Sequence, residues 1–255
     1  MQYTKANSIF WDKQAESGDD WTIPVSGEAY RRALEGELTL HLTPCKPVSA
    51  AWFPPLKGAS VFGLASGGGQ QGPIFAAHGA QVTIMDLSDK QLAAERMVAE
   101  REGYSINIVK GDMTQPFPFE DDSFDLIFHP VSNCYVEDIR HIWVECHRVL
   151  KKGGTLLAGF CKEELFLFDC KHRRNPPLIV ARTLPHNPLN TLTKAQLDAK
   201  MEKGEVINFS HTLEEQIGGQ IAAGFSLQGI YDDRDRWGVF AQYMNSYTAT
   251  WAVKL

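Results

Sequence analysis

Short apolar runs alternate along the chain with segments in which apolar residues recur every three or four positions. These runs cover residues 60–65, 81–86, 105–109, 124–128 and 155–160. Each has the length and composition of a buried strand. The segments after the second and fourth runs have the helical period instead. Strands that alternate with helices predict parallel strands joined by right-handed crossovers.

Capping residues indicate where the crossover helices begin and end. Pro73 suits the first turn of a helix, and Gly79 suits its C-terminal end. Ser88 and Gln91 have the spacing of a capping box, and Gly103 predicts the end of that helix. The next helix is expected over residues 136–150, with a turn at 151–154 before the fifth strand.

The C-terminal part predicts two further strands, at residues 225–231 and 247–253. No helical pattern separates them, so we expect them to pair antiparallel. The predicted fold class is therefore α/β, with a Rossmann-like, doubly wound, seven-stranded sheet that is mostly parallel and has an antiparallel C-terminal strand.

Two segments lie outside the alternation. The leader, residues 1–59, is polar with scattered aromatic residues. Residues 161–211 contain four prolines, which exclude long regular structure, and a segment of this kind is usually functional. We predict an N-terminal leader or lid over 1–59 and one main domain over 60–255, with a cap insertion at about 161–211.

Composition and charge exclude several classes of function. The chain has 255 residues, a net charge of −6 and no basic stripe, so nucleic acid is not expected as a partner. The five cysteines include no C-x-x-C pair, which favours a reducing cytoplasm, and no apolar run is long enough to predict a membrane span. Cys134, His129 and His141 lack the spacing of a zinc site, so no metal is expected. The sequence does not predict an oligomeric state.

The candidate chemistry lies in the glycine-rich segment 66–72 and the acid that follows it. Glycines let the backbone approach a ligand, and the helix start behind them offers unpaired N–H groups. Asp86 ends the second strand, where it is placed to accept hydrogen bonds from ribose hydroxyls. This unit predicts a nucleoside site. The spacing Gly67-x-Gly69-x-x-Gly72 also fits a dinucleotide fingerprint, so an NAD(P)-dependent oxidoreductase stays open as an alternative.

Three features favour another nucleoside: the tighter spacing Ala65-x-Gly67-x-Gly69, a second acid at Asp112 after the third strand, and the final strand pair without a helix. Together they resemble class I S-adenosylmethionine-dependent methyltransferases, in particular the small-molecule, type 11 or quinone-biosynthesis-like branch. The resemblance implies S-adenosylmethionine as the cofactor and methyl transfer to an O, N or C atom of a small-molecule acceptor. A non-catalytic module that binds the cofactor is a further alternative.

The resemblance also assigns residues to the site. It implies that Asp86 binds the ribose and that the remaining cofactor-binding positions are Ala65, Ser66, Gly67, Gly69, Leu87, Asp112, Met113, His129 and Asn133. Two positions depart from the family pattern. Gly63 stands where the family often has an acid. Ala65 stands where it has glycine, and we expect a negative φ there because alanine disfavours the left-handed region.

The acceptor is expected to bind beside the cofactor, outside the carboxyl ends of the strands. A sulfonium methyl group is already activated, so holding the nucleophile in line supplies much of the catalysis. His129 is the candidate general base. Trp11 in the leader and Phe166 in the insertion are expected to cover the acceptor, and Asn133 and Tyr135 to face it from below.

Overall fold

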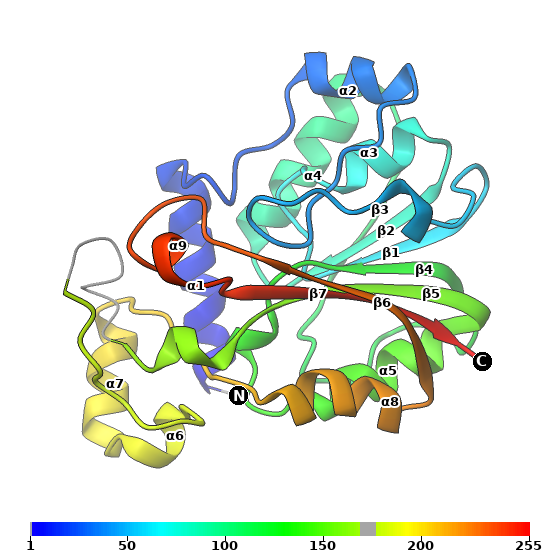
Figure 1. The fold of residues 1–255 in the computed structure, drawn as a ribbon. Coiled ribbons are helices and arrows are strands. Elements are labelled where there is room, and N and C mark those ends of the chain that lie inside the picture. Colours follow the sequence, from blue (N-terminus) through cyan, green and yellow to red (C-terminus); the bar gives the residue numbers. More distant parts are fainter. Residues whose placement is uncertain (1, 169–176) are drawn as a thin grey trace.

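The computed structural model describes residues 2–168 and 177–255, and within them a seven-stranded sheet forms the centre of the molecule (Figure 1). Its strands are β1 (Ser60–Leu64), β2 (Gln81–Asp86), β3 (Asn107–Lys110), β4 (Phe124–His129), β5 (Leu150–Cys161), β6 (Phe225–Asp233) and β7 (Tyr247–Lys254). The strand order is β3-β2-β1-β4-β5-β7-β6. Strands β1 to β5 pair in parallel, while β7 pairs antiparallel with both β5 and β6. The predicted fold class is confirmed.

Helices cover both faces of the sheet (Figure 1). On one face lie α2 (Gly27–Leu34), α3 (Gly72–Ala77) and α4 (Asp89–Glu102). The other face is covered by α5 (Arg140–Val149) and by α8 (Gly219–Ala222), which continues a π-helical turn, η5 (Glu214–Gly218). Near the carboxyl ends of the parallel strands lie α1 (Gln2–Ser17), α6 (Pro188–Thr191), α7 (Lys194–Glu202) and α9 (Phe240–Tyr243). In the described part of the chain there are also 3₁₀ turns at η1 (Ala50–Trp52), η2 (Asn133–Tyr135) and η3 (Glu163–Phe166).

The core consists of two apolar layers, because alternate residues of each strand point to opposite faces. The layer beneath α5 contains Phe62, Ile127 and Trp143, all fully buried. The layer beneath α3 and α4 contains Phe75 and Phe128, whose rings meet edge-on at 5.4 Å. Both faces of the sheet are therefore buried, and its carboxyl edge is left for a site.

Most predicted helix ends are confirmed, and the reasons for the exceptions are local. Ser88 Oγ accepts from Gln91 N at 3.2 Å, and Gly103 ends α4 with φ +75°. Helix α5 begins only at Arg140, because Val136 is extended after η2 and the N-cap of α5 is Ile139. The predicted turn at 151–154 is a bulge within β5.

The insertion contains more helix than the prolines suggest. In α7, Thr193 and Gln196 form a capping box. A basic run at residues 171–174, expected to be a solvated loop, lies outside the described residues.

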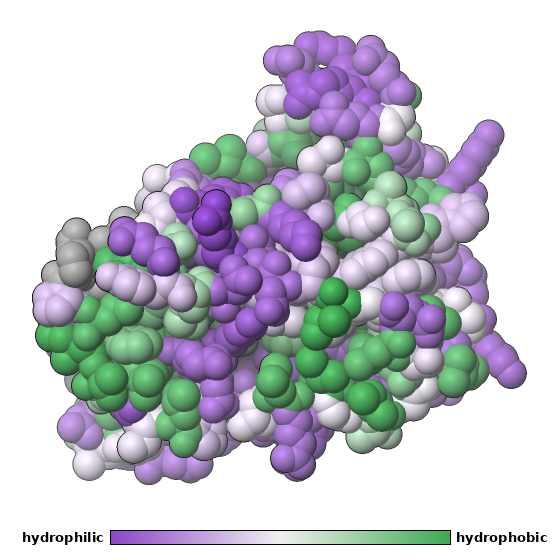
Figure 2. Space-filling model, viewed as in Figure 1, coloured by the Kyte–Doolittle hydropathy of each residue, from purple (hydrophilic) through white to green (hydrophobic). Residues whose placement is uncertain are grey.

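The surface carries apolar side chains over α8 and the adjoining part of β6 (Figure 2). Ile221 and Ile230 are the exposed large apolar residues of these two elements, at 56% and 57%. Within residues 2–168 and 177–255, no helix has both the length and the hydrophobicity needed to cross a bilayer.

Candidate functional site

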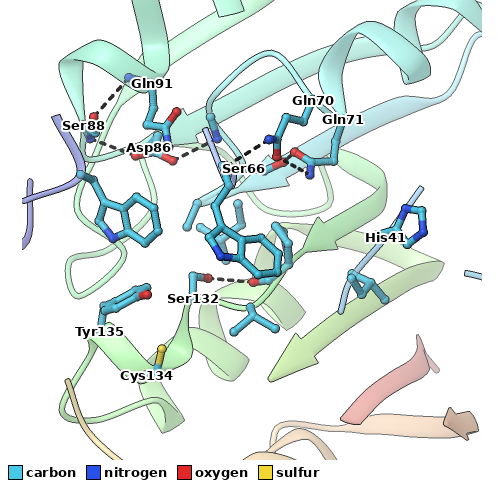
Figure 3. A pocket seen from close by; sticks show the side chains of 18 of the residues that line it. His41, Ser66, Gln70, Gln71, Asp86, Ser88, Gln91, Ser132, Cys134 and Tyr135 are labelled. Carbon is cyan, nitrogen blue, oxygen red and sulfur yellow. Dashed lines mark hydrogen bonds between the residues drawn. The ribbon is translucent and has the colours of Figure 1, made fainter. Parts of the chain in front are cut away.

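A cavity of about 720 Å³ lies at the carboxyl ends of β1, β2 and β4 (Figure 3). Its volume is in the range of roughly 300–1,000 Å³ that is typical of small-molecule sites. In Figure 3, Asp86, Ser88 and Gln91 lie at one end of the cavity, and Ser66, Gln70 and Gln71 lie above its centre. Ser132, Cys134 and Tyr135 form the opposite wall.

The Asp86 carboxylate holds the glycine loop beside the cavity. Its Oδ2 accepts from Gly67 N at 3.0 Å, and its Oδ1 accepts from Ser88 N at 2.9 Å. Burial raises the pKa of Asp86, and the two amides oppose that rise. Each oxygen has accepted one backbone hydrogen bond, so each retains acceptor capacity for a ligand hydroxyl.

Ala65 begins the loop in a conformation opposite to the one expected. Its φ is +48°, in the left-handed region, so the expectation of a negative φ is wrong. The strand end determines this geometry, because Ala65 N donates to Met85 O at 2.8 Å before the chain turns into the loop. The turn directs Ala65, Ser66 and Gly67 to the cavity.

The other predicted cofactor positions fall into two groups. Leu87, Asp112 and Met113 line the cavity at the ends of β2 and β3. Asp112 Oδ1 accepts from Thr114 N at 2.9 Å and from its hydroxyl at 2.8 Å, which fixes the acid at the edge of the cavity. Gly69 lies outside the lining, since its amide is turned toward α4.

Helix α1 covers the end of the cavity formed by Leu87 and Ser88. Ser8 Oγ donates to Leu87 O at 2.9 Å. Asp12 Oδ1 accepts from Ser88 Oγ at 2.6 Å and from Lys90 N at 3.1 Å, so α1 is attached to the first turn of α4.

The opposite side of α1 is attached to the insertion. Asn7 Nδ2 donates to Ile207 O, and Ile207 N donates back to Asn7 Oδ1, both at 2.8 Å. Trp11 meets Tyr135 edge-on, with ring centroids 5.5 Å apart, and both residues line the cavity. The leader and the insertion thus meet over the site.

The far wall of the cavity carries several apolar side chains beside polar ones such as His41 and Arg236. The apolar side chains are those of Leu42, Val131, Cys134, Leu165 and Phe166. The segment that carries Leu42 lies beside β4, since Val131 N donates to Leu42 O at 3.3 Å. Burial raises the pKa of the Tyr135 phenol well above its ordinary value, and the neighbouring Cys134 and Cys161 add to the rise.

His129 and Asn133 lie behind the cavity wall instead of in it. His129 is fully buried, with Nδ1 3.0 Å from Leu64 O and Nε2 2.7 Å from Asn133 Oδ1. Asn133 Nδ2 donates in turn to Gln216 Oε1 at 2.8 Å. Burial lowers the pKa of His129. Because both ring nitrogens are engaged within the core, this geometry does not support the predicted roles of His129 as a general base and of Asn133 as a site residue.

Several lining residues were not anticipated from the sequence. Gln70 and Gln71 belong to the glycine-rich segment, so their place in that motif could have identified them as lining residues. Gln91 was noted only as a capping residue. Leu42 and Arg236 come from segments without a motif, and only tertiary structure brings them to the cavity. Among residues 2–168 and 177–255, no group of three or more His, Cys, Asp or Glu side chains could hold a metal ion.

The strand order, the glycine loop after β1 and the acid at the end of β2 are those of class I S-adenosylmethionine-dependent methyltransferases. The chain belongs to this family. The family model described as "Methyltransferase domain" matches residues 62–158. The chain is 45% identical to the uncharacterized methyltransferase YbaJ of Bacillus subtilis over 98% of its own length and 97% of the relative.

Two more distant similarities concern parts of the chain or its fold. A sterol 24-C-methyltransferase of Aspergillus fumigatus is 33% identical over 38% of this chain and 25% of that protein. An S-adenosylmethionine-dependent methyltransferase from Mesorhizobium loti has a similar structure, with a TM-score of 0.60, 20% identity and coverage of 80% of this chain and 94% of that one. The protein is an enzyme with S-adenosylmethionine as its cofactor. The oxidoreductase and non-catalytic alternatives are not retained.

The residues present fit this cofactor. Asp86 is a half-buried carboxylate at the cavity with remaining acceptor capacity, as a ribose diol requires. Leu87 and Met113 provide apolar surface for a flat base, and Asp112 adds an acceptor beside them. Ser66 and Gln71, joined by a 2.9 Å hydrogen bond, offer polar atoms where the loop faces the cavity.

Proposed function

We propose that the methyl acceptor is a small molecule with a largely apolar body, held between η2, the segment around Leu42 and the insertion. The observation that carries this proposal is the composition of the far wall, where Leu42, Val131 and Phe166 adjoin the loop end of the cavity. Apolar lining with a few polar groups is typical of sites for small ligands. The relative from Aspergillus fumigatus, by its name a sterol methyltransferase, supports the same class of acceptor.

We also propose which residues hold the cofactor and which contact the acceptor. Ala65, Ser66, Gly67, Asp86, Leu87, Asp112 and Met113 hold the cofactor, and Trp11, Tyr135 and Phe166 contact the acceptor. The cofactor supplies a methyl group that its sulfonium already activates. The protein's own contribution is to place the acceptor in line and to exclude water, and positioning of this kind can supply roughly 7–11 kcal/mol of a barrier.

Proton handling at the acceptor differs from the expectation for His129. Tyr135 is the titratable residue that faces both Trp11 and the thiols of the wall. A phenol is protonated at neutral pH at its ordinary pKa, and burial raises the pKa of Tyr135 further, so it acts as a hydrogen-bond donor to the acceptor rather than as a base.

The leader and the insertion act together as the cover of this site. Helix α1 is hydrogen-bonded to Leu87 and Ser88 on one side and to Ile207 on the other. The cover therefore spans both the cofactor end and the acceptor end. This arrangement supports the division into a lid over residues 1–59 and a methyltransferase domain over 60–255 with a cap at about 161–211.

Two measurements test the function. A thermal-shift panel of S-adenosylmethionine, S-adenosylhomocysteine, NAD and NADP should show stabilisation by the first two alone. Saturation at 100 times the dissociation constant should add about 2.7 kcal/mol to the free energy of unfolding.

Release of S-adenosylhomocysteine is then followed with a panel of small apolar acceptors, for wild type and Phe166→Ala, with Tyr243→Ala as the matched control. Tyr243 is 73% exposed and lies outside the cavity. We expect turnover on at least one apolar acceptor, reduced by Phe166→Ala alone. Turnover confined to a protein or nucleic-acid acceptor would contradict the proposal.

A further inference from the structure

Helix α4 holds the glycine loop from the side opposite the cavity. Gly68 N donates to the Gln91 carbonyl at 3.0 Å, and Gly69 N donates to Glu95 Oε1 at 2.6 Å. Together with the amide that Asp86 holds, three successive N–H groups of the loop have fixed partners. Two of these partners are side-chain carboxyl groups, and that of Glu95 reaches the loop from beneath.

The surroundings of Glu95 disfavour a charge. The residue is fully buried, and its Oε2 has no hydrogen-bond partner among the described residues. A Cβ at Gly72 would lie 2.7 Å from that oxygen, so backbone closes over it. The Tyr104 hydroxyl is likewise buried without a described partner. An isolated carboxylate in such a place is costly, whereas a neutral carboxylic acid is tolerated.

We propose that Glu95 is a positioning residue for the cofactor loop, that it holds the Gly69 amide as a neutral acid, and that its ionisation loosens the loop and weakens cofactor binding. The anion accepts the Gly69 N–H more strongly, but the charge on the unpartnered Oε2 can be solvated only if the backbone that closes over it at Gly72 moves. This inference rests on the proposed role of the loop in holding the cofactor. Glu95 itself does not line the cavity, so it acts only through the loop.

The electrostatic surroundings agree with this assignment. Burial raises the pKa of Glu95 to about 8; the Gly69 N–H opposes the rise and the Asp86 charge adds to it. The nearest other ionisable group is Tyr104, and both burial and the Glu95 charge raise its pKa. Tyr30 stacks on Tyr104 with ring centroids 5.6 Å apart. The exposed Arg101 and its ion-pair partner Glu102 lie beyond them. Among residues 2–168 and 177–255 no cation contacts the carboxyl group, so no nearby positive charge offsets the effect of burial on its pKa.

The sign of the effect follows from the raised pKa. The folded protein keeps the Glu95 proton to higher pH than the unfolded chain, so this contribution to stability is complete below pH 4.5 and is lost as the pH rises toward 8. If the loop binds cofactor only when Glu95 is neutral, the dissociation constant is independent of this group below pH 7 and increases about tenfold per pH unit above pH 8.

The experiment compares wild type with Glu95→Gln and Glu95→Ala in calorimetric titrations with S-adenosylhomocysteine from pH 6.5 to 9.5. Glu100→Gln, an exposed change on the same helix, is the matched control. Glutamine keeps an acceptor for Gly69 N and cannot ionise, so it imitates the neutral acid. The ligand's own amino group titrates alike in every protein, so the ratio of wild-type to variant dissociation constants isolates Glu95.

We expect a ratio of wild type to Glu95→Gln near one at pH 6.5 and about thirty at pH 9.5, as release of one proton with a pKa of about 8 requires. Glu100→Gln should follow wild type throughout, and Glu95→Ala should bind about tenfold more weakly at pH 6.5 because the Gly69 amide loses its acceptor.

Parallel pH profiles for wild type and Glu95→Gln would overturn the proposal, and so would a Glu95→Gln protein that is unfolded or binds poorly at pH 6.5. If Glu95→Ala does not fold, the comparison with glutamine still decides. Failure of wild type to bind at any pH would instead refute the proposed role of the loop.

Discussion

Replacing Ala65 by glycine should stabilise the protein. Ala65 has φ +48°, in the left-handed region that side chains with a Cβ disfavour. It follows β1 directly, and its N–H is committed to Met85 O at 2.8 Å, so the backbone has little freedom to relax. The strain therefore remains in the native state, at a residue that lines the cavity.

Two opposing contributions give the expected magnitude. An L-residue in the left-handed region costs about 1–2 kcal/mol, and glycine avoids that cost. Glycine in turn loses more conformational entropy on folding, about 0.5–1 kcal/mol relative to alanine. The net gain in the free energy of unfolding is about 0.5–1 kcal/mol, which corresponds to an increase in Tm of roughly 1–4 °C for a chain of this size.

Urea unfolding of wild type and Ala65→Gly measures this difference. The midpoint should increase while the slope with denaturant concentration stays the same. Ala93→Gly is the matched control, because Ala93 is exposed within α4 and has no left-handed strain to relieve. That variant should lose about 1 kcal/mol. A loss of similar size for Ala65→Gly would refute the argument from strain.

Four further outcomes follow from the site. Asp86→Ala removes the ribose acceptor and the partner of two backbone amides, those of Gly67 and Ser88. Each charge-assisted bond contributes roughly 1.5–3 kcal/mol, so calorimetry should show at least tenfold weaker S-adenosylhomocysteine binding. An unchanged dissociation constant would show that Asp86 does not contact the ribose. Asp12→Ala detaches α1 from α4, so stopped-flow fluorescence should show faster cofactor release, and an unaltered rate would argue against a lid. Phe166→Ala should change acceptor KM more than cofactor affinity in steady-state assays, and equal effects on both would contradict its place at the acceptor end. Turnover should survive EDTA, because the described residues offer no metal-ligand group; loss that a divalent ion restores would show that this reading is wrong.

The Asp86→Ala measurement needs a control for stability, because the change also leaves the Gly67 and Ser88 amides without their acceptor. Asp86→Asn keeps one acceptor oxygen for these amides while it removes the charge. A melting curve for each variant, recorded without ligand, separates loss of fold from loss of affinity. Because Asp86 holds these loop amides, we expect the alanine variant to lose some stability as well as affinity.

The sheet and the position of the loop could be predicted from the sequence because their signals are local. Apolar runs, Pro73, the Ser88 cap and Gly103 each act within a few residues, and the structure retains them. The placement of Asp86 and of the cavity followed from the same signals, since the carboxyl ends of parallel strands share one edge.

What the sequence could not provide are features that depend on distant segments. His129 is occupied by Leu64 and Asn133, one of which is 65 residues away. The orientation of the Gly69 amide depends on its hydrogen bond to Glu95, and no sequence motif predicts that contact. Helix α1 shows no clear apolar face, because it is stabilised by polar contacts from both sides rather than by one buried stripe.

The position of β7 between β5 and β6 has a consequence for how the chain acquires its structure during synthesis. Residues 225–233 leave the ribosome before residues 247–254, yet β6 has no neighbour in the sheet until β7 has paired with β5. For that interval β6 is an extended segment with an open edge, and β5 is an open edge as well. Edges of this kind are where nascent chains pair wrongly with one another. Strand β7 thus covers the open edge of β5 and gives β6 its neighbour, and the yield of folded protein should be most sensitive to substitutions that slow its pairing.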